Sequence, residues 1–396
     1  MEVTVMIESY IRRKNGLVDI EADFQSINDY NVFSNYFGLK NQGAFAIKIF
    51  GLKYNKRIYS NRYYDLDLDY IKQNGKIQTI TDSFLYGFEL DFDEDEQHEF
   101  GNVFQNPSQS RLQQTNSPHT NAINIQSNLL QNAPIEIVVY DVGNGNWNEI
   151  RSQGEARVVY DIGASLNASK NEIQALVGRI VPSYCNLSVK PLLVISHWDK
   201  DHYHCLKALS DAEILHFDSM ICVASPPTAT AQFIYDRVKS LISVIVIHPK
   251  ARQRGMPSLP DLLSRSGGLS IYACRQHPEI NLSGLQLFVR SNDSNALLTG
   301  DCGWFQVNHI LSNEAAFSNS NEKCNMVVPH HGSGRDTTYY GFVLPPTFMT
   351  GKCAAISVNK KKNSYGFPSN SLIKYLRTIF PQIEQTDKTG DIIMPL

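Results

Sequence analysis

The sequence lacks paired cysteines, long apolar runs and a strong net charge. Its seven cysteines are an odd number without CxxC spacing, which argues against a disulfide framework and a zinc–cysteine cluster. No apolar run approaches the roughly 18 residues that a membrane span needs, and the charged start has no signal-peptide core. We therefore expect a cytoplasmic protein with no membrane attachment. A formal net charge of -3 excludes a protein that is basic throughout and coats nucleic acid, although a local basic patch stays open.

The length and the distribution of rare residues indicate where the chemistry lies. At about 150 residues per domain, the 396 residues predict two to three domains, and 42% hydrophobic with 19% charged residues is typical of a globular protein. Nine of the eleven histidines, all seven cysteines and all three tryptophans follow residue 140. We expect the functional site in the C-terminal two-thirds of the chain.

Composition divides the chain into three segments. Residues 1–104 predict a small α+β or mostly-β accessory domain without a catalytic constellation, in which the tyrosines near Tyr63 are expected to pack in the core rather than to bind a partner. Residues 105–132 are rich in Asn, Gln and Ser and follow an acidic run, so they predict a mobile linker, with an ordered loop as the alternative. Residues 133–396 alternate short buried strands with amphipathic helices, which is typical of a layered α/β domain.

The third segment begins with two apolar strands that each end in Asp-x-Gly. Residues 135–140 and 156–160 predict a hairpin, followed at Asp141 and Asp161 by these turns. Ser169 and Glu172 have capping-box spacing and predict the start of an amphipathic helix. Further strands are predicted at 191–196, 220–224, 243–247, 285–289, 296–298, 326–328 and 354–358, and helices at 231–242, 304–311 and 371–380.

The strongest signal is the sequence from Ser196 to His202, which places two imidazoles and two carboxylates directly after a buried strand. Unpaired charges at such a position are costly to desolvate, whereas a divalent metal would stabilise them. Two more strands end in potential ligands, at Thr299-Gly300-Asp301 and at His330-His331-Gly332-Ser333. A polar surface turn is the alternative for each motif alone. Together the three strand ends predict a metal site.

These motifs give the chain from 135 to 396 a resemblance to the metallo-β-lactamase fold. The similarity is to its HxDxDH variant and to the ComEC-like branch, known from the nuclease domain of bacterial competence proteins. The matching motifs lie, in chain order, at 141–145, 161–163, 197–202, 281–283, 299–301, 330–333, 365–368 and 386–390. The resemblance implies an αββα sandwich, that is two mixed β-sheets flanked by helices, with a two-metal site at one edge. The membrane channel of competence proteins is absent, so DNA uptake is not implied.

The resemblance also implies roles for individual residues. The implied metal ligands are His197, Asp199, Asp201, His202, Asp301 as a bridge, and one histidine of the His330-His331 pair, of which we favour His330. Asp201 and His331 are the implied catalytic residues. Asp161 and Asp141 would contact the ligand residues without binding the metal themselves. Asp161 would accept a hydrogen bond that orients a ligand histidine. Phe367 occupies the position at which many relatives have a histidine, so the role of that histidine is not carried over.

The expected cofactors are two divalent metal ions, Mn²⁺ or Zn²⁺. Asp199 replaces a ligand histidine and makes the donor set richer in oxygen, which shifts the preference towards manganese. Two such ions roughly 3.5 to 4 Å apart activate water and stabilise phosphoryl oxygens, so the leading hypothesis is a phosphodiesterase or nuclease that acts on DNA.

Two other functional hypotheses stay open. The same site would also suit a nucleotide second messenger or another small ester or diester, because fold does not decide function. Alternatively, the chain is a metal-degraded interaction module in a multi-protein, defence-related complex, with a protein partner bound by the N-terminal domain. Phe367 favours this second alternative, and the intact set of potential ligands argues against it.

Several residues near the motifs suit contacts with nucleic acid. The basic ones are Lys250, Arg252, Arg254, Lys352 and the run 360–362, for which contact with a phosphate backbone and simple solvation are equal alternatives. The three tryptophans, Trp147, Trp198 and Trp304, are expected to pack in the core rather than to stack on bases.

Overall fold

The structure is a computed structural model that forms two compact units. It describes residues 1–13, 16–39, 46–53, 58, 62–80, 87–92, 104–105, 130, 134–224, 226–251, 257–277, 279–291, 294–315, 323–333, 351–359 and 366–396. The first unit contains Met1–Ser117 and Ser225–Arg237, and the second contains Pro118–Ala224 and Val238–Leu396. The predicted linker, 105–132, lies outside the described residues except for residues 105 and 130, and it stays a prediction.

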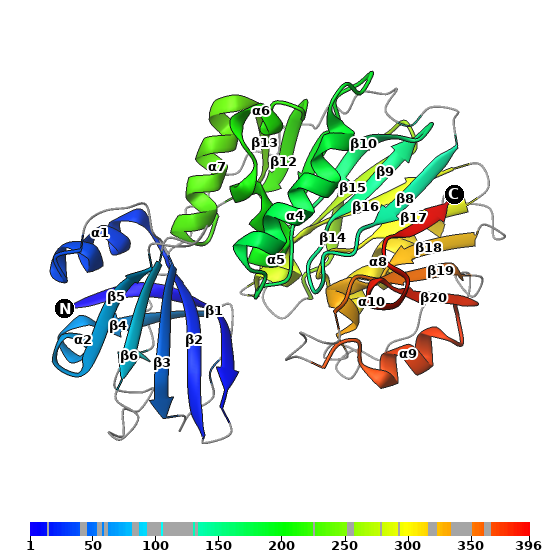
Figure 1. The fold of residues 1–396 in the computed structure, drawn as a ribbon. Helices are drawn as coiled ribbons and strands as arrows, with labels where there is room; N and C mark the ends of the chain where they lie inside the picture. The colour runs from blue at the N-terminus through cyan, green and yellow to red at the C-terminus, as the bar shows by residue number, and fades with distance from the viewer. Residues whose placement is uncertain are drawn as a thin grey trace. The chain divides into compact units, whose positions relative to one another are not determined.

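The first unit contains a seven-stranded, mostly antiparallel sheet with the order β5-β6-β3-β2-β1-β4-β7 (Figure 1). The strands are β1 (Glu2–Arg12), β2 (Leu17–Phe24), β3 (Ala46–Lys53), β4 (Arg62–Asp67), β5 (Gly75–Ile80), β6 (Gly87–Phe92) and β7 (Phe104–Gln105). Among the described residues, α1 (Ile27–Tyr36) and α2 (Leu68–Asn74) accompany them, together with the part of α7 (Ala229–Leu241) up to residue 237. The hydroxyl of Ser26 accepts a hydrogen bond from the Asp29 amide and fixes the start of α1.

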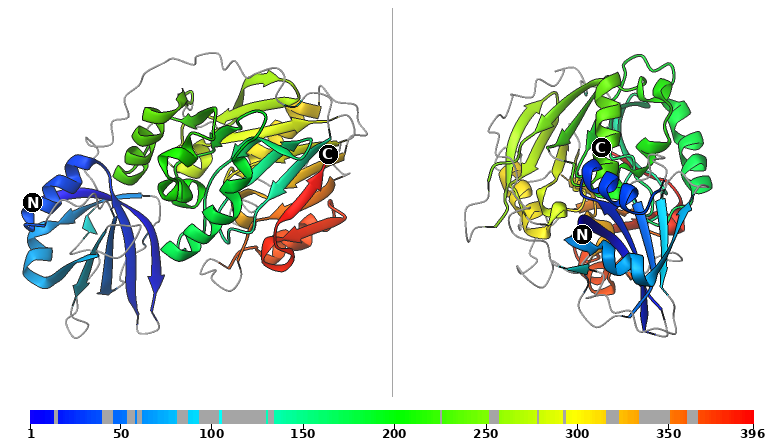
Figure 2. Two further views of the ribbon diagram at one scale, coloured as in Figure 1. Left: turned by 45° about the horizontal axis from the view of Figure 1, so that its top comes forward. Right: turned by 90° about the vertical axis from the view of Figure 1, so that its left-hand side faces the viewer.

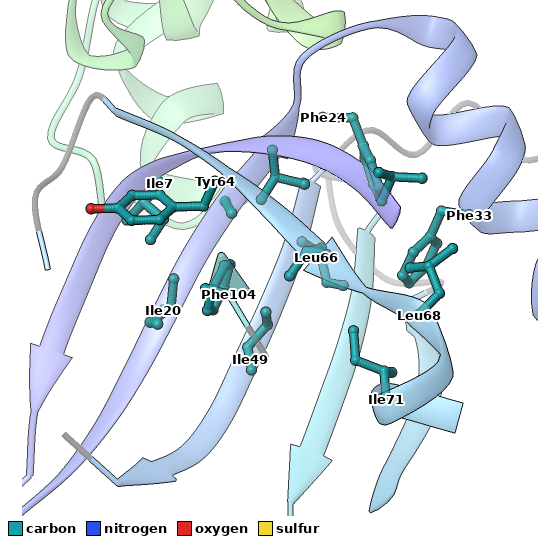
Figure 3. Packing of buried hydrophobic residues seen from close by; sticks show 14 of the residues in the cluster. Ile7, Ile20, Phe24, Phe33, Ile49, Tyr64, Leu66, Leu68, Ile71 and Phe104 are labelled. Carbon is teal, nitrogen blue, oxygen red and sulfur yellow. The ribbon is translucent and has the colours of Figure 1, made fainter. Parts of the chain in front are cut away.

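The core of the first unit lies between the sheet and its helices. Phe24 and Phe33 pack together with Leu66, and Figure 3 shows these side chains pointing into one cluster. The ring of Tyr64 also lies in this core, whereas the hydroxyl of Tyr63 donates to the carbonyl of Pro227 at 2.9 Å. Burial raises the pKa of Tyr63 to about 12. Both described tyrosines are thus packed rather than exposed; the neighbouring ones at 54 and 59 lie outside the described residues.

The second unit is built on two seven-stranded mixed sheets (Figure 1). The first has the order β13-β12-β11-β10-β9-β8-β21, with strands β8 (Ile135–Val139), β9 (Asn148–Ser152), β10 (Glu155–Tyr160), β11 (Leu192–Ile195), β12 (Ser219–Val223), β13 (Ser243–Ile247) and β21 (Ile392–Pro395). The second has the order β14-β15-β16-β17-β18-β19-β20, with strands β14 (Pro260–Ser266), β15 (Leu269–Cys274), β16 (Leu285–Arg290), β17 (Ser294–Leu298), β18 (Lys323–Val327), β19 (Gly351–Ile356) and β20 (Gln382–Gln385). The Tyr160 hydroxyl donates to the Leu285 carbonyl and joins the two sheets.

Helices flank this pair of sheets, which lie against each other in Figure 2. The described α-helices of this unit are α4 (Lys170–Ile180), α5 (Lys200–Tyr203), α6 (Asp211–Ile214), α8 (Trp304–Ala315), α9 (Asn370–Leu376) and α10 (Thr386–Thr389), and the end of α7 from residue 238 also belongs to it. The predicted capping box of Ser169 and Glu172 is present at the start of α4, which buries one apolar face. Helices α8 and α9 bury theirs against the second sheet. The αββα sandwich expected from the sequence is confirmed.

The predicted hairpin at the start of this unit was wrong. β8 and β10 do not pair with each other, because β9 lies between them and pairs antiparallel with both. This strand was missed because it contains polar residues. Glu149 is fully buried there, with its carboxylate accepting from the Tyr140 hydroxyl and from Arg151, both at 2.7 Å. Glu149 can be buried because its carboxylate has hydrogen-bond partners inside the fold. A charged residue at a buried position interrupts the apolar pattern by which a strand is predicted from the sequence.

The rare residues of this unit are mostly structural. Trp147, Trp198 and Trp304 are all buried, in agreement with the packing prediction. All seven cysteines are free, and only Cys185 is exposed.

Among the described helices, none is both long and apolar enough to span a membrane.

Candidate metal centre

The ends of four strands supply the candidate site, and all belong to the second unit. Asp161 follows β10, the motif from His197 to His202 follows β11, Asp301 follows β17, and the His330-His331 pair follows β18. Close backbone approach is built in at Gly163, because a Cβ there would lie 1.6 Å from the Asp201 carbonyl oxygen. Only glycine fits at that position.

One group of potential ligands contains Asp201, His202, Asp301 and His331. Each of these buried residues offers one ligand atom, and the four atoms lie within 4.8 Å of one another. The Nε2 atom of His202 lies 3.1 Å from Oδ1 of Asp301, and Nε2 of His331 lies 3.2 Å from Oδ2 of Asp201. Two imidazoles and two carboxylates in such a cluster form a suitable donor set for a divalent cation.

A second group contains His197, Asp199 and Asp301, again with one atom from each residue within 4.8 Å. The Nε2 atom of His197 lies 3.6 Å from Oδ2 of Asp199. Asp301 is common to both groups. Each group could hold a metal ion, and the two groups share this carboxylate.

Three atoms at the centre of these groups are buried without a hydrogen-bond partner among the described residues. They are Nε2 of His197, Nε2 of His202 and Oδ1 of Asp301. Nε2 of His202 and Oδ1 of Asp301 face each other at 3.1 Å without hydrogen-bond geometry, and Nε2 of His197 has no polar neighbour that meets it either. Buried polar atoms without a hydrogen bond cost free energy. A bound cation would satisfy all three, so the residues present fit a divalent metal.

Asp161 orients the ligand histidine from behind. Its carboxylate is fully buried and accepts from the backbone amide of Ser196 at 2.7 Å and from the Ser196 hydroxyl at 2.8 Å. Its Oδ2 atom also lies 2.8 Å from Nδ1 of His202. A proton on Nδ1 leaves Nε2 of His202 with a free lone pair towards the ligand cluster.

The charges within the cluster compensate one another. Burial by itself would raise the pKa of Asp301, but His330 and His202 hold it well below its ordinary value. Burial by itself would lower the pKa of His202, but Asp301 and Asp161 raise it well above its ordinary value. The Asp301 carboxylate is therefore ionised at neutral pH, as a metal ligand must be, and a cation that binds Nε2 of His202 would displace a proton from this ring.

The histidine pair has a different geometry from the one expected. We expected His330 to be the metal ligand and His331 to be catalytic. His331 is 3% exposed, and its Nδ1 donates to the Ser357 carbonyl at 2.9 Å, with Nε2 directed at Asp201. The side chain of His330 is 26% exposed, and its Nε2 lies 3.7 Å from Oδ2 of Asp301. Both residues have positive φ in the turn Pro329–Gly332, and the two rings are directed differently.

Asp141 and Phe367, which the sequence analysis also singled out, have contacts that the structure defines. The backbone of Asp141 contacts Asp391 and Arg179, and within the described residues no hydrogen bond joins its carboxylate to the ligand cluster. Burial raises the pKa of Asp141. The Phe367 ring meets the His330 ring edge-on, with 5.5 Å between centroids. Phe367 thus borders the site.

Some supporting residues had no predicted role. The Asn281 amide donates to Oδ2 of Asp301 at 3.3 Å, and the Asn146 backbone amide donates to the Asp201 carbonyl at 3.0 Å. Ser357 supplies the carbonyl that fixes His331. Asn281 falls in a matched motif, whereas Asn146 and Ser357 gave no signal because their partners lie 55 or 26 residues away in the chain.

The basic residues singled out in the sequence are mostly engaged or outside the described residues. Lys250 lies 3.6 Å from the Asp261 carboxylate, and Lys352 donates to the Pro395 carbonyl at 2.7 Å. Arg252, Arg254 and the run 360–362 fall outside the described residues. Neither described lysine therefore favours contact with phosphate over solvation, the two alternatives that the sequence leaves open.

Comparison with known proteins gives matches to solved structures only. No family model matches the chain, and no curated protein matches it. Tm1679, a metal-dependent hydrolase of the β-lactamase superfamily, aligns with 12% identity and a TM-score of 0.37 over 66% of this chain and 99% of that one. A mutant of the CmlA β-hydroxylase aligns with 12% identity and a TM-score of 0.36 over 67% of this chain and 54% of that one. The assignment of the αββα fold rests on the strand order and layers described above.

Proposed function

We propose that the protein is a metal-dependent hydrolase that cleaves phosphodiester bonds, with DNA as the leading substrate. The observation that supports this most strongly is the pair of ligand groups that share Asp301. When bound, two divalent ions would supply Lewis-acid activation of water and of a phosphoryl oxygen.

Six residues would hold the metals, and they combine three carboxylates with three imidazoles. They are His197, Asp199, Asp201, His202, Asp301 and His331. Carboxylates favour hard ions and imidazoles suit zinc, so Mn²⁺ and Zn²⁺ are the proposed cofactors. Asp161 and the Ser357 carbonyl hold His202 and His331 in the orientation that metal binding requires.

His330 is the proposed proton donor to the leaving group. It is the more exposed histidine of the pair, and its Nε2 atom lies close to Asp301. Phe367 covers one side of its ring and offers it no hydrogen bond, so the imidazole stays available to the substrate. General acid catalysis by a positioned imidazole contributes about 10² to 10⁴-fold to a rate.

The test measures cleavage of single-stranded DNA, double-stranded DNA and bis(p-nitrophenyl) phosphate with Mn²⁺, Zn²⁺, Mg²⁺ or EDTA. Metal content is counted by mass spectrometry on the same samples. The site variant combines Asp201→Ala with His202→Ala. The matched control combines Asp218→Ala with His216→Ala, a carboxylate and an imidazole outside the ligand cluster.

Metal-dependent DNA cleavage that the site variant loses and the control retains is the expected result. Bound metal with cleavage of the small diester alone would replace DNA by a small ester or diester as the substrate. Absence of bound metal from the wild type would contradict the proposal and favour the interaction module, with the N-terminal domain as the part that binds a protein partner.

A further inference from the structure

A hollow of about 500 Å³ lies in the second unit beside α9 and α10. The residues that line it are Pro368, Asn370, Ile373, Lys374, Arg377, Gln385 and Lys388. The ligand cluster uses none of these residues. Its volume falls in the range of pockets that hold a small ligand, which also suits one nucleotide.

The lining of the hollow is positively charged. Lys374, Arg377 and Lys388 are exposed, and none of the seven described lining residues is acidic. Among the described residues, no carboxylate forms an ion pair with these three cations. Lys374 lies in α9 and Arg377 follows three residues later at its C-terminal end, so the two share one face of the helix. Three uncompensated cations around one concave surface attract anions.

A buried polar side chain also lines the hollow. Gln385 is 6% exposed, and its Oε1 atom has no hydrogen-bond partner among the described residues. A side-chain amide carries two N–H donors as well as its oxygen, and the two ends exchange places by rotation about the last side-chain bond. The N–H groups of Gln385, rather than its oxygen, would donate to a phosphate oxygen placed in the hollow.

The hollow is connected to the metal centre by two neighbouring residues. Pro368, which lines the hollow, packs so closely against Gly332 that a Cβ on this glycine would lie 2.6 Å from the proline Cβ. Gly332 directly follows His331. Phe367, the residue before Pro368, contacts the ring of His330. Phe367 and Pro368 therefore join the surroundings of His330 to the lining of the hollow.

We propose that this hollow binds a backbone phosphate of a nucleic-acid strand next to the bond that is cleaved. The inference rests on the proposed function and deepens it, because it specifies an extended phosphodiester chain rather than a small diester as the substrate. Lys374, Arg377 and Lys388 supply the charge, and Gln385 supplies a directed hydrogen bond. Phe367 provides a wall between this subsite and the reacting phosphate.

The test measures binding rather than cleavage. The full-length protein is titrated, in EDTA, against fluorescein-labelled oligothymidylates of two and twelve nucleotides, and anisotropy is recorded over a series of salt concentrations. The hollow variant combines Lys374→Gln, Arg377→Gln and Lys388→Gln. The control combines Lys76→Gln, Lys190→Gln and Lys323→Gln, which removes the same charge from exposed positions outside the hollow. A further variant, Gln385→Leu, removes the amide without changing the charge.

We expect the hollow variant to bind the twelve-nucleotide probe about tenfold more weakly. Its salt slope should fall by about 2, because each cation that neutralises a phosphate of a single strand contributes roughly 0.7 to that slope. Gln385→Leu should weaken binding with an unchanged salt slope. The control should bind like the wild type. Equal weakening in the hollow variant and the control, or no affinity of the wild type for the probe, would overturn the inference.

The two proposals fail in different ways. Because the binding assay contains no metal, it reports on the hollow even when the protein cleaves nothing. Loss of binding in the hollow variant, in a protein that cleaves no diester, would support the phosphate subsite and contradict the hydrolase. Cleavage of DNA with unaltered binding in the hollow variant would contradict the subsite alone. Competition by thymidine monophosphate for the same cations would show that a single phosphate suffices.

Discussion

Replacing Asp161 by asparagine should weaken metal binding while leaving the fold intact. The residue has a φ of 63°, which asparagine adopts readily, and the two side chains have nearly the same size. The carboxylate accepts hydrogen bonds at both oxygens, from Ser196 and from Nδ1 of His202. An amide has one acceptor oxygen, and if this oxygen keeps the Ser196 amide, the NH₂ group faces Nδ1 of His202. Nδ1 must then accept, so the proton moves to Nε2, the proposed metal-binding atom.

The expected magnitude follows from this change of tautomer. Loss of a carboxylate that orients a ligand histidine costs about 10- to 100-fold in metal affinity. This corresponds to about 1.4 to 2.7 kcal/mol of binding free energy. The other five proposed ligands keep their positions, so binding is weakened and not abolished. A larger effect than this would indicate that the substitution disturbs the motif from His197 to His202 as a whole.

The assay is a competition for Zn²⁺ or Mn²⁺ between the protein and a chelating dye. Urea denaturation in EDTA shows whether each variant is folded. Asp218→Asn, a change of the same chemistry at an exposed position, is the matched control and should have wild-type affinity. A folded Asp161→Asn variant with wild-type metal affinity would refute the argument that this carboxylate sets the tautomer of His202.

Three further predictions concern pH, a buried ion pair and metal linkage. Burial lowers the pKa of His204, so below roughly pH 6.5 the unfolded chain takes up a proton that the folded chain does not. In EDTA, the unfolding free energy of the wild type should therefore decrease between about pH 6.5 and 5, by up to about 2 kcal/mol more than that of the His204→Phe variant. An equal decrease in the two proteins would contradict this prediction. The Glu314→Gln variant should have an unfolding free energy about 3 kcal/mol lower than the wild type, as measured by urea denaturation. This is the low end of the range for a broken buried ion pair, because the side chains of its partners Arg265 and Arg290 are 30% and 26% exposed to solvent. Metal at about 100 times its dissociation constant should raise the unfolding free energy by about 2.7 kcal/mol, and Asp301→Ala should abolish this increase in the same denaturation assay.

Strand and helix positions were predictable where burial follows a simple period. The capped helix after Ser169 is where the pattern placed it, because its apolar residues face one core. The strand at 243–247 is also at its predicted position, although it is an edge strand in which only Ile247 is buried. β9 and β14 were missed. β9 carries the buried Glu149, and β14 is an edge strand with the exposed Leu262, so neither produces alternating burial of apolar side chains. Their places depend on partners that only the folded sheets supply.

The candidate ligands were also predictable, because carboxylates and imidazoles after buried strands are unusual without a cation. The motif from His197 to His202 and the strand ends at Asp301 and His331 are readable in the chain, and the structure brings them within ligand distance of one another. The choice between His330 and His331 was not readable. It depends on the positive φ angles of the two histidines and on the hydrogen bond to the Ser357 carbonyl, and these features cannot be recognised from the amino-acid sequence.

The sequence by itself determined which residues can carry the chemistry and which layers they connect, because burial, capping and donor chemistry are local properties. Only the tertiary structure decided which atoms face one another. The shared carboxylate of Asp301, the support from Asn281 and the basic hollow around Gln385 each join segments that are far apart in the chain. Such contacts form when the two sheets pack against each other, and this packing is stabilised by the whole hydrophobic core rather than by any one segment of the chain.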